Sequence, residues 1–270
     1  LGRGDIADLI ARHGLHPSRA LGQNFVADPN TVRRIVELAR VGPGDPVVEI
    51  GPGLGSLTLA LCEAGADVTA VEVDRHLIPV LEEVTAGTDA RIVHADATSV
   101  DWSSLLAGHA SWSVVANLPY NVGTPLVLDL LDDVPAVTSM LVMVQREVGE
   151  RFAAPPGDKA YGIPSVKVAY HGHAEVVGRV PPTVFIPQPK VDSVLVRITR
   201  SAQPTVDADP HRLFQLVRTG FGQRRKMLRR SLGGLVSPEA FEAAGIDPQA
   251  RPEQLDIHAR GRLATAATDV

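Results

Sequence analysis

The chain has 270 residues, of which 44% are hydrophobic and 21% are charged, and its formal net charge is -5. This length can hold one large domain and a smaller one, and the composition is that of an ordinary globular protein, which excludes a fibrous or disordered chain. No apolar run approaches the roughly 20 residues that a membrane span requires, and the acidic balance excludes a uniformly basic surface but leaves room for a local basic face.

The N-terminal sequence and the cysteine content favour the cytoplasm. The first residues contain no apolar core of a signal peptide. The single cysteine, Cys62, has no partner for a disulfide within the chain, and its apolar neighbours indicate a packing role. We therefore expect a cytoplasmic protein, and a monomer because the sequence contains no heptad repeat.

Two helices are predicted before the first strand. Residues 5–14 place Ile6, Leu9 and Ile10 on one side of a short amphipathic helix. A polar loop, LGQNFV at 21–26, follows. Asp28 and Pro29 then form the N-cap and first-turn pair of a second helix.

The stretch EIGPGLGSLT at 49–58 predicts a strand, a glycine turn and a helix. Gly51, Gly53 and Gly55 stand at alternate positions after the apolar strand at 46–50. A turn that lies against a ligand favours glycine, because its backbone has no room for Cβ atoms and often needs positive φ. The helix start behind the turn offers free N–H groups to an anionic group.

A carboxylate follows at the spacing of a nucleotide-binding βαβ unit. Glu72 ends a second predicted strand at 67–73 and lies 21 positions after Gly51. A carboxylate about 20 residues after the first glycine hydrogen-bonds ribose hydroxyls in such units. Ser56 stands where a dinucleotide fingerprint has its third glycine. The pattern therefore favours an adenosine cofactor other than NAD.

The rest of the first 200 residues alternates between strand and helix patterns. A helix is expected to begin near residue 77 or 78, just before Pro79, and another at Thr124. Further strands are predicted at 90–94, 112–116, 137–144, 166–170, 174–180 and 193–198. The alternation predicts an α/β protein with a mostly parallel seven-stranded sheet, helices on both faces and antiparallel strands at its end.

A domain boundary is predicted after residue 200. The stretch SAQPTVDADP at 201–210 is polar and contains prolines, and the residues after it follow a helical pattern. We expect a catalytic domain over 1–200 and a small all-helical domain over 201–270.

The predicted strand ends carry polar groups suited to one site. Ligands of open parallel sheets bind beyond the carboxyl ends of the strands. The first two strands supply the glycine turn and Glu72, the third ends at Asp96, and the fourth ends at the tetrapeptide NLPY, residues 117–120. These groups are expected to meet at the same edge.

The tetrapeptide suits a site that activates an exocyclic purine amine, which is a poor nucleophile because its lone pair is delocalised into the ring. The Asn117 side chain and the Leu118 carbonyl can accept the two amine hydrogens and so turn the lone pair toward an electrophile. Pro119 has no N–H and a fixed φ, so it stiffens the loop. Tyr120 offers a face for base stacking, worth about 1 to 3 kcal/mol. This chemistry needs no metal, and we read His171 and His173 as surface residues.

A basic cluster lies in the predicted helical domain. Seven Lys or Arg residues and no acid occur between His211 and Arg230. The densest group is expected to form a basic helical face over a packed layer of Met227, Leu228 and Leu232; it comprises Arg224, Arg225, Lys226, Arg229 and Arg230. The lack of balancing carboxylates favours a phosphate-binding face.

Taken together, eight motifs resemble the ribosomal RNA adenine dimethyltransferases, and the likeness is strongest to the bacterial enzymes that act on the small subunit. They are LGQNF at 21–25, EIGPGLGSLT at 49–58, VEVD at 71–74, HAD at 94–96, NLPY at 117–120, MVQREV at 143–148, FIPQPKVDS at 185–193 and FGQRRKMLRR at 221–230. The resemblance covers essentially the whole chain in the same order.

The resemblance implies a Rossmann-like class I methyltransferase fold and transfer of methyl groups from S-adenosylmethionine to adenine N6. The implied substrate is a pair of adjacent adenosines near the 3′ end of small-subunit (16S) ribosomal RNA, modified during subunit biogenesis. The basic cluster would dock this RNA. Two positions depart from the family pattern, Val26 and Pro164, where leucine is usual.

The resemblance also assigns site residues. Asn24 and Val26 would contact the cofactor from the N-terminal loop, Gly51 would approach its methionine part, Glu72 its ribose and Asp96 its adenine amine. Asn117 would lie between cofactor and target. Tyr120 and Phe185 would hold the flipped adenine between their rings.

Three alternatives stay open at this point. The same chemistry on large-subunit ribosomal RNA is the nearest, because the resistance-type relatives share the NLPY-like loop. A DNA adenine methyltransferase is disfavoured, because no extra region is available to read a duplex. The third is a ribosome-assembly factor that binds without turnover, which the intact Asn117 and Tyr120 disfavour.

Overall fold

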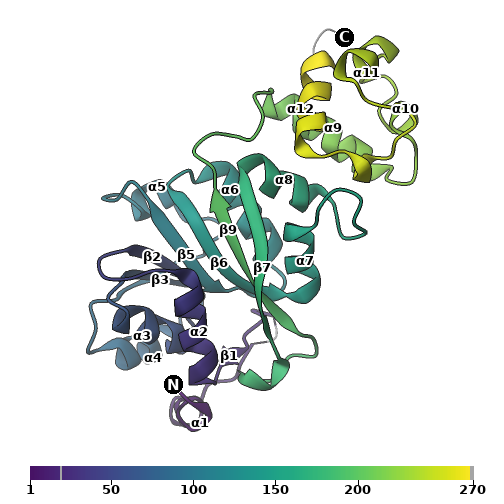
Figure 1. Ribbon diagram of the computed structural model, residues 1–270. Helices are drawn as coiled ribbons and strands as arrows, with labels where there is room; N and C mark the ends of the chain where they lie inside the picture. The colour runs from purple at the N-terminus through teal and green to yellow at the C-terminus, as the bar shows by residue number, and fades with distance from the viewer. Residues whose placement is uncertain (19, 268–270) are drawn as a thin grey trace. The chain divides into compact units, whose positions relative to one another are not determined.

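The computed structural model describes residues 1–18 and 20–267, which form two compact units. The first unit comprises Leu1–Gly149 and Glu175–Arg200, and the second comprises Glu150–Ala174 and the chain from Ser201 onward. The chain passes from one unit to the other within α7 (Arg146–Ala153), within β7 (Gly172–Val180), both labelled in Figure 1, and again between Arg200 and Ser201.

The first unit contains the sheet. Its other elements are α1 (Arg3–Arg12), β1 (Phe25–Val26), α2 (Pro29–Ala39), β2 (Pro46–Ile50), α3 (Ser56–Glu63), β3 (Asp67–Glu72), α4 (Ile78–Thr85), β4 (Arg91–His94), α5 (Trp102–Leu105), β5 (Trp112–Asn117), α6 (Gly123–Asp133), β6 (Val137–Gln145), η1 (Pro182–Val184), β8 (Phe185–Ile186) and β9 (Ser193–Arg200).

The described residues form a seven-stranded sheet in the order β4-β3-β2-β5-β6-β9-β7. The first five strands of this order pair in parallel, whereas β6 and β9 pair antiparallel. The predicted class, a mostly parallel sheet with an antiparallel end, is confirmed. The strand order reverses between β2 and β5, where Ile50 pairs with Val71 on one side and Ala116 on the other. Such a reversal creates a crevice for ligands at the carboxyl ends of the strands.

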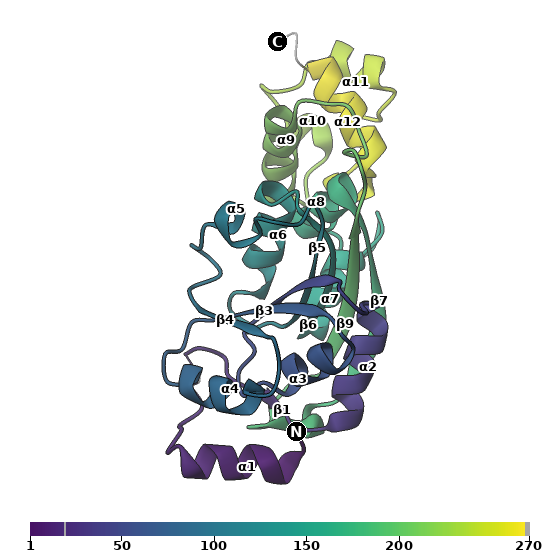
Figure 2. The same cartoon turned by 90° about the vertical axis from the view of Figure 1, so that its left-hand side faces the viewer.

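Helices cover both faces of this sheet. The two views place α2 on one face and α6 on the other (Figures 1 and 2). On the α2 face, Val32 and Ile35 are buried in a cluster with Leu57 and Leu61 of α3 and with residues of the central strands. Because both faces are covered, β6 is buried along most of its length, as its continuous apolar run predicts.

Local sequence determines where two of these helices begin. The Asp28 side chain accepts a hydrogen bond of 2.8 Å from the N–H of Thr31, and Pro29 stands in the first turn of α2. Helix α4 begins at Ile78 with Pro79 in its first turn, where a missing N–H costs nothing. Both predicted helix starts are confirmed.

The second unit is helical. Its elements are α8 (Ile163–His171), α9 (Pro210–Gly222), α10 (Leu228–Ser231), α11 (Pro238–Ala244), η2 (Pro252–Gln254) and α12 (Ile257–Ala266). They bury a core of their own that includes Tyr161, Leu213, Leu228, Phe241 and Leu263.

The predicted strand at 166–170 is wrong, because these residues belong to α8. Pro164 lies in the first turn of this helix, where proline is well tolerated. The N–H of Gly162 donates to the Ser165 hydroxyl at 3.0 Å, and this bond closes the helix start. The family departure at Pro164 therefore coincides with a helix start rather than a strand start.

The predicted domains are defined by function, a catalytic domain before residue 201 and an RNA-docking domain after it, and this assignment stays a prediction. In terms of packing, residues 150–174 associate with the second unit. The reason lies in α8, whose Val166 and Tyr170 are buried in the same cluster as Leu213 and Phe214 of α9.

Candidate active site

A cavity of about 220 Å³ lies at the carboxyl ends of the parallel strands, where the strand order reverses. This is several times the roughly 30 Å³ that one water occupies in the liquid, so the cavity can hold an organic ligand. The structure brings most of the predicted catalytic and cofactor-binding residues together in its lining: Asn24, Val26, Gly51, Gly53, Glu72, Asp96, Asn117 and Pro119. The groups predicted at four successive strand ends therefore meet at one site.

The glycine turn between β2 and α3 adopts a backbone that other residues rarely adopt. Gly51, Gly53 and Gly55 have φ values of 69°, 59° and 85°. A Cβ atom on Gly53 would lie 2.8 Å from Cδ1 of Phe25, so this position has no space for a side chain. Gly55 does not line the cavity; it precedes the first residue of α3 and packs against α4 through Leu81.

The Glu72 side chain is held in place by two backbone donors. Its Oε2 accepts a hydrogen bond of 3.1 Å from the N–H of Gly53, and its Oε1 accepts one of 2.9 Å from the N–H of Asp74. Burial raises the pKa of this carboxyl, and the two backbone bonds act in the opposite direction. The bond to Gly53 ties the end of β3 to the glycine turn, so the carboxylate and the turn keep a fixed relationship.

Glu49 is a second buried carboxyl group in the cavity lining, and we did not single it out from the sequence. Its side chain is 1% exposed, and Oε2 accepts a hydrogen bond of 2.5 Å from the Thr58 hydroxyl. Burial raises its pKa to about 8, although the Thr58 bond lowers it. The sequence signal that could have identified Glu49 is an acidic residue inside an apolar strand, directly before the glycine turn.

Asp96 lies just after β4 and lines the same cavity. Its Oδ1 accepts hydrogen bonds from the Thr98 hydroxyl at 2.7 Å and from the Thr98 N–H at 2.8 Å. The hydroxyl bond holds the pKa of this carboxyl below its usual value. Asp96 therefore stays ionised at neutral pH, and both hydrogen bonds from Thr98 use Oδ1, so Oδ2 can accept from a ligand amine.

The N-terminal loop is joined to the end of β5. The side-chain amide of Asn117 donates a hydrogen bond of 3.0 Å to the carbonyl of Asn24. The Asn24 amide donates to the Gly22 carbonyl at 3.1 Å, and the Gln23 amide donates to Oδ2 of Asp74 at 2.8 Å. The loop is thus fastened on two sides of the cavity, to β5 and to the segment after β3.

The remaining residues of NLPY are positioned by the sheet. The N–H of Leu118 donates to the Met143 carbonyl at 3.1 Å, and the Leu118 side chain is buried. The Tyr120 hydroxyl lies 3.1 Å from Oγ of Ser193, the first residue of β9. Pro119 lines the cavity, whereas Tyr120 does not.

Phe185 is not among the residues that line the cavity. It pairs with Val26 across the short sheet of β1 and β8, and its ring is 1% exposed within the hydrophobic cluster that contains Leu141 and Leu195. The structure therefore does not bring this ring to the cavity, and its predicted contact with a flipped base stays a prediction.

The five predicted RNA-binding cations lie in the second unit, in a segment that is only partly helical. We refer to residues 224–230 as the basic segment. Residues 224–226 form a turn, and only Arg229 and Arg230 lie in α10. The expected basic helical face is thus wrong, because the chain turns at 223–227 before α10 begins. Met227, which we expected to pack beneath, is 39% exposed, while Leu228 and Leu232 are buried.

The structure also bears on whether the chain has a metal site or a membrane-spanning helix. In the part of the chain that the structure describes, no group of three or more His, Cys, Asp or Glu side chains is arranged to hold a metal ion. Across these same residues, none of the helices combines the length and apolar character needed to cross a bilayer.

The chain matches one protein family over almost its whole length. The family model described as "Ribosomal RNA adenine dimethylase" matches residues 16–266. Among curated proteins, "Ribosomal RNA small subunit methyltransferase A" of Kineococcus radiotolerans is 47% identical over 270 residues, covering 96% of this chain and 89% of that protein. The protein of the same name from Cutibacterium acnes is 49% identical over 277 residues, covering 97% of this chain and 91% of that protein.

Solved structures share the fold. The 23S rRNA methyltransferase ErmE aligns with a TM-score of 0.71 and 25% identity, over 90% of this chain and 99% of that chain. A dimethyladenosine transferase from Plasmodium falciparum aligns with a TM-score of 0.77 and 22% identity, over 88% of this chain and 95% of that chain.

Proposed function

Because the chain belongs to the ribosomal RNA adenine dimethylase family, we propose that it dimethylates N6 of two adjacent adenosines near the 3′ end of small-subunit ribosomal RNA, with S-adenosylmethionine as methyl donor. The convergence of Gly51, Glu72, Asp96 and Asn117 on one cavity is the observation that carries the chemistry. The relatives at 47% and 49% identity favour the small subunit over the large one.

The cavity residues fit the donor. S-adenosylmethionine supplies an electrophilic methyl group on a positively charged sulfonium. We propose that Glu72 accepts hydrogen bonds from the ribose hydroxyls, a role suited to a carboxylate already oriented by Gly53 and Asp74. Asp96 would accept from the adenine amine. The open side of Gly51, where an added Cβ would meet only the Asn117 carbonyl at 3.9 Å, would accommodate the methionine part.

The surrounding residues would complete the cofactor site. Asn24 and Val26 would approach from the N-terminal loop, which is fastened to Asn117. Gly53 and Gly55 would shape the turn rather than contact the ligand through side chains. Glu49 and Glu72 both line the cavity, and a carboxylate there suits a ligand that carries a cationic sulfonium; because burial raises the pKa of Glu49 to about 8, the negative charge at neutral pH would come mainly from Glu72.

Catalysis would depend on positioning the target amine. Since the Asn117 NH₂ group donates to Asn24, its Oδ1 is directed as an acceptor. We propose that this oxygen and the Leu118 carbonyl accept the two N6 hydrogens, which turns the nitrogen lone pair toward the methyl group. The same oxygens would stabilise the developing ammonium. A strong general base is not required, because N6 becomes acidic once it carries the new methyl group.

The target base would be held by aromatic rings after it leaves the stack. Tyr120 is suited to this role through its bond to Ser193, which orients its ring. Phe185 would provide the opposite face, and because its ring is 1% exposed this role requires β8 to rearrange when RNA binds. The basic segment of the second unit would dock the RNA backbone. We further propose that the protein acts as a monomer in the cytoplasm.

The test is methyl transfer from labelled S-adenosylmethionine to unmethylated small subunits and, in parallel, to large subunits, followed by nucleoside analysis. We expect dimethyladenosine from the small subunit alone. Label in the large subunit would favour the large-subunit specificity of the 23S rRNA methyltransferase ErmE. No transfer to either would favour a binding factor, and an Asn117→Ala protein that still supports subunit assembly would favour it further.

A further inference from the structure

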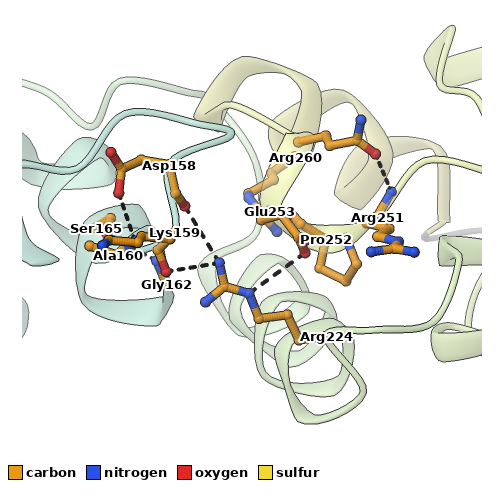
Figure 3. Close-up of polar contacts among 11 residues, drawn as sticks. Asp158, Lys159, Ala160, Gly162, Ser165, Arg224, Arg251, Pro252, Glu253 and Arg260 are labelled. Carbon is orange, nitrogen blue, oxygen red and sulfur yellow. Dashed lines mark hydrogen bonds and ion pairs between the residues drawn. The ribbon is translucent and has the colours of Figure 1, made fainter.

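The five cations of the basic segment do not share one environment. Arg225, Lys226 and Arg230 are exposed. Arg224 instead contacts other segments of the second unit: its Nη2 lies 3.1 Å from the Lys159 carbonyl and 3.4 Å from the Asp158 carbonyl. Its Nε lies 3.7 Å from Oε2 of Glu253. Figure 3 shows the guanidinium directed at both partners, between the loop at 158–159 and η2.

We infer that Arg224 is a positioning residue, which fixes the basic segment from within, and that RNA phosphates are contacted by its exposed neighbours. This inference rests on the proposed function, because it divides the work within the surface proposed to dock RNA. It departs from the expectation that all five cations of the segment bind RNA alike.

Glu253 is the anchor of this arrangement. Its backbone carbonyl accepts a hydrogen bond of 2.8 Å from the N–H of Gly157, while its carboxylate faces Arg224. One residue therefore fastens both the loop before α8 and the start of the basic segment. The Glu253 side chain is 20% exposed and that of Arg224 is 37% exposed, so the pair is less screened than an ordinary surface ion pair.

The other end of the basic segment is also fastened, through its backbone. The N–H of Leu228 donates to the Ala250 carbonyl at 2.8 Å, and the N–H of Arg229 donates to the Pro248 carbonyl at 2.9 Å. Residues 225–227 span the gap between the Arg224 side chain and these two bonds. Loss of the Arg224 contacts would free one end of the turn that carries Arg225 and Lys226.

The distribution of charge also separates Arg224 from its exposed neighbours. The carboxylate of Glu253 offsets the positive charge of Arg224, so this pair adds little to the potential that attracts phosphates. An exposed cation without a nearby acid displaces counterions when it binds an RNA phosphate. Removing one such cation therefore reduces the slope of log K against log salt concentration by about one. Arg225 and Lys226 are exposed and form no ion pair with any of the described residues, whereas Arg224 pairs with Glu253.

The sign of the Glu253→Gln effect tests the inference. Binding of wild type and variant is measured with unmethylated small subunits and with a short RNA duplex, over a range of salt concentrations. Removal of a negative charge tightens RNA binding if Arg224 contacts phosphate, because Arg224 is then released to do so. We expect several-fold weaker binding instead. Glu242→Gln, which removes an exposed carboxylate of α11, is the matched control and should not weaken binding.

The salt slope gives a second, independent readout. Arg225→Gln should lower the slope by about one. Arg224→Gln should weaken RNA binding and leave the salt slope unchanged. Arg224→Lys retains the charge but not the three contacts, so it should also weaken binding without changing the slope. The double variant Arg224→Gln/Glu253→Gln should bind no more weakly than either single variant. A slope lowered by one in Arg224→Gln, or wild-type binding by Arg224→Lys, would overturn the inference.

Thermal unfolding of every variant separates these effects from loss of structure. Should Arg224→Gln fail to fold, Arg224→Lys and Glu253→Gln decide the question. Wild-type protein that binds the duplex but not small subunits would contradict the proposed target, and the duplex measurements would then test the inference alone. Wild-type protein that binds neither RNA would overturn both.

Discussion

The side-chain amide of Asn117 donates a hydrogen bond of 3.0 Å to the backbone carbonyl of Asn24, which lies 93 positions earlier in the chain. This bond joins the N-terminal loop to the end of β5 and fixes which atom of the amide is left to accept. It therefore links binding of the cofactor, proposed for Asn24, to presentation of the target amine, proposed for Asn117.

Replacement of Asn117 by alanine should reduce methyl transfer strongly with little effect on folding. Loss of one preorganised polar group that stabilises transition-state charge typically lowers the rate by about 10²- to 10³-fold, and we expect a decrease in kcat of this order. The rate of methyl incorporation at saturating substrate measures it. Asn30→Ala, at an exposed position of α2, is the control and should retain activity. A loss below threefold in Asn117→Ala would contradict the assigned role.

Glu49 should make the protein less stable as the pH rises. Its pKa is raised from 4.5 to about 8 in the folded protein. The folded state therefore binds more protons than the unfolded state between these values, so this contribution to stability is fully present below pH 4.5 and is lost as the pH rises to about 8. The expected loss is on the order of a few kcal/mol.

Urea unfolding at pH 5, 7 and 9 measures this dependence. Glu49→Gln should flatten the decline without abolishing it, because burial also raises the pKa of Glu72. The exposed Glu63→Gln variant should retain the wild-type profile. An unchanged profile in Glu49→Gln would show that this carboxyl is ionised in the folded protein.

Gly53 should tolerate no side chain, for two reasons that a control can separate. Its φ is 59°, and an added Cβ would lie 2.8 Å from Cδ1 of Phe25. Gly14 has a φ of 58°, but a Cβ there would have no atom within 4 Å. Gly14→Ala should thus cost about 1 kcal/mol from backbone strain alone, and Gly53→Ala should cost more. Equal unfolding free energies for the two variants would argue against the steric account.

The hydrogen bond between Tyr120 and Ser193 should contribute to activity by orienting the Tyr120 ring. Tyr120→Phe and Ser193→Ala each remove the same hydrogen bond, so the double variant should lose no more activity than either single variant, a decrease of about 3- to 10-fold. Tyr120→Ala should lose much more, because the stacking face is removed as well. Additive losses in the double variant would show that Ser193 does not act through Tyr120.

Local patterns were sufficient for the sheet and for the polar groups at its edge. The alternation of strands and helices and the rule for strand ends predict that Gly51, Glu72, Asp96 and Asn117 lie at one edge of the sheet, and all four line one cavity there. These predictions depend on residues close in sequence or on the general geometry of parallel sheets.

The predictions that were wrong, and the feature that was missed, depend on contacts between distant segments. The run VKVAY at 166–170 alternates as a strand does, yet it is helical because its buried residues pack on α9. The basic segment reads as a helical face, but its turn is closed by Glu253 and by carbonyl groups at 158 and 159. The raised pKa of Glu49 depends on burial by the whole first unit, which strand periodicity alone does not reveal.

The central claim is tested most directly by mapping the modified nucleotides. Unmethylated small subunits are treated with the protein and S-adenosylmethionine, and fragments of their RNA are analysed by mass spectrometry. The account predicts two adjacent N6,N6-dimethyladenosines near the 3′ end with wild-type protein and neither with Asn117→Ala. Methyl groups at other positions, or an unaltered product pattern with Asn117→Ala, would contradict it.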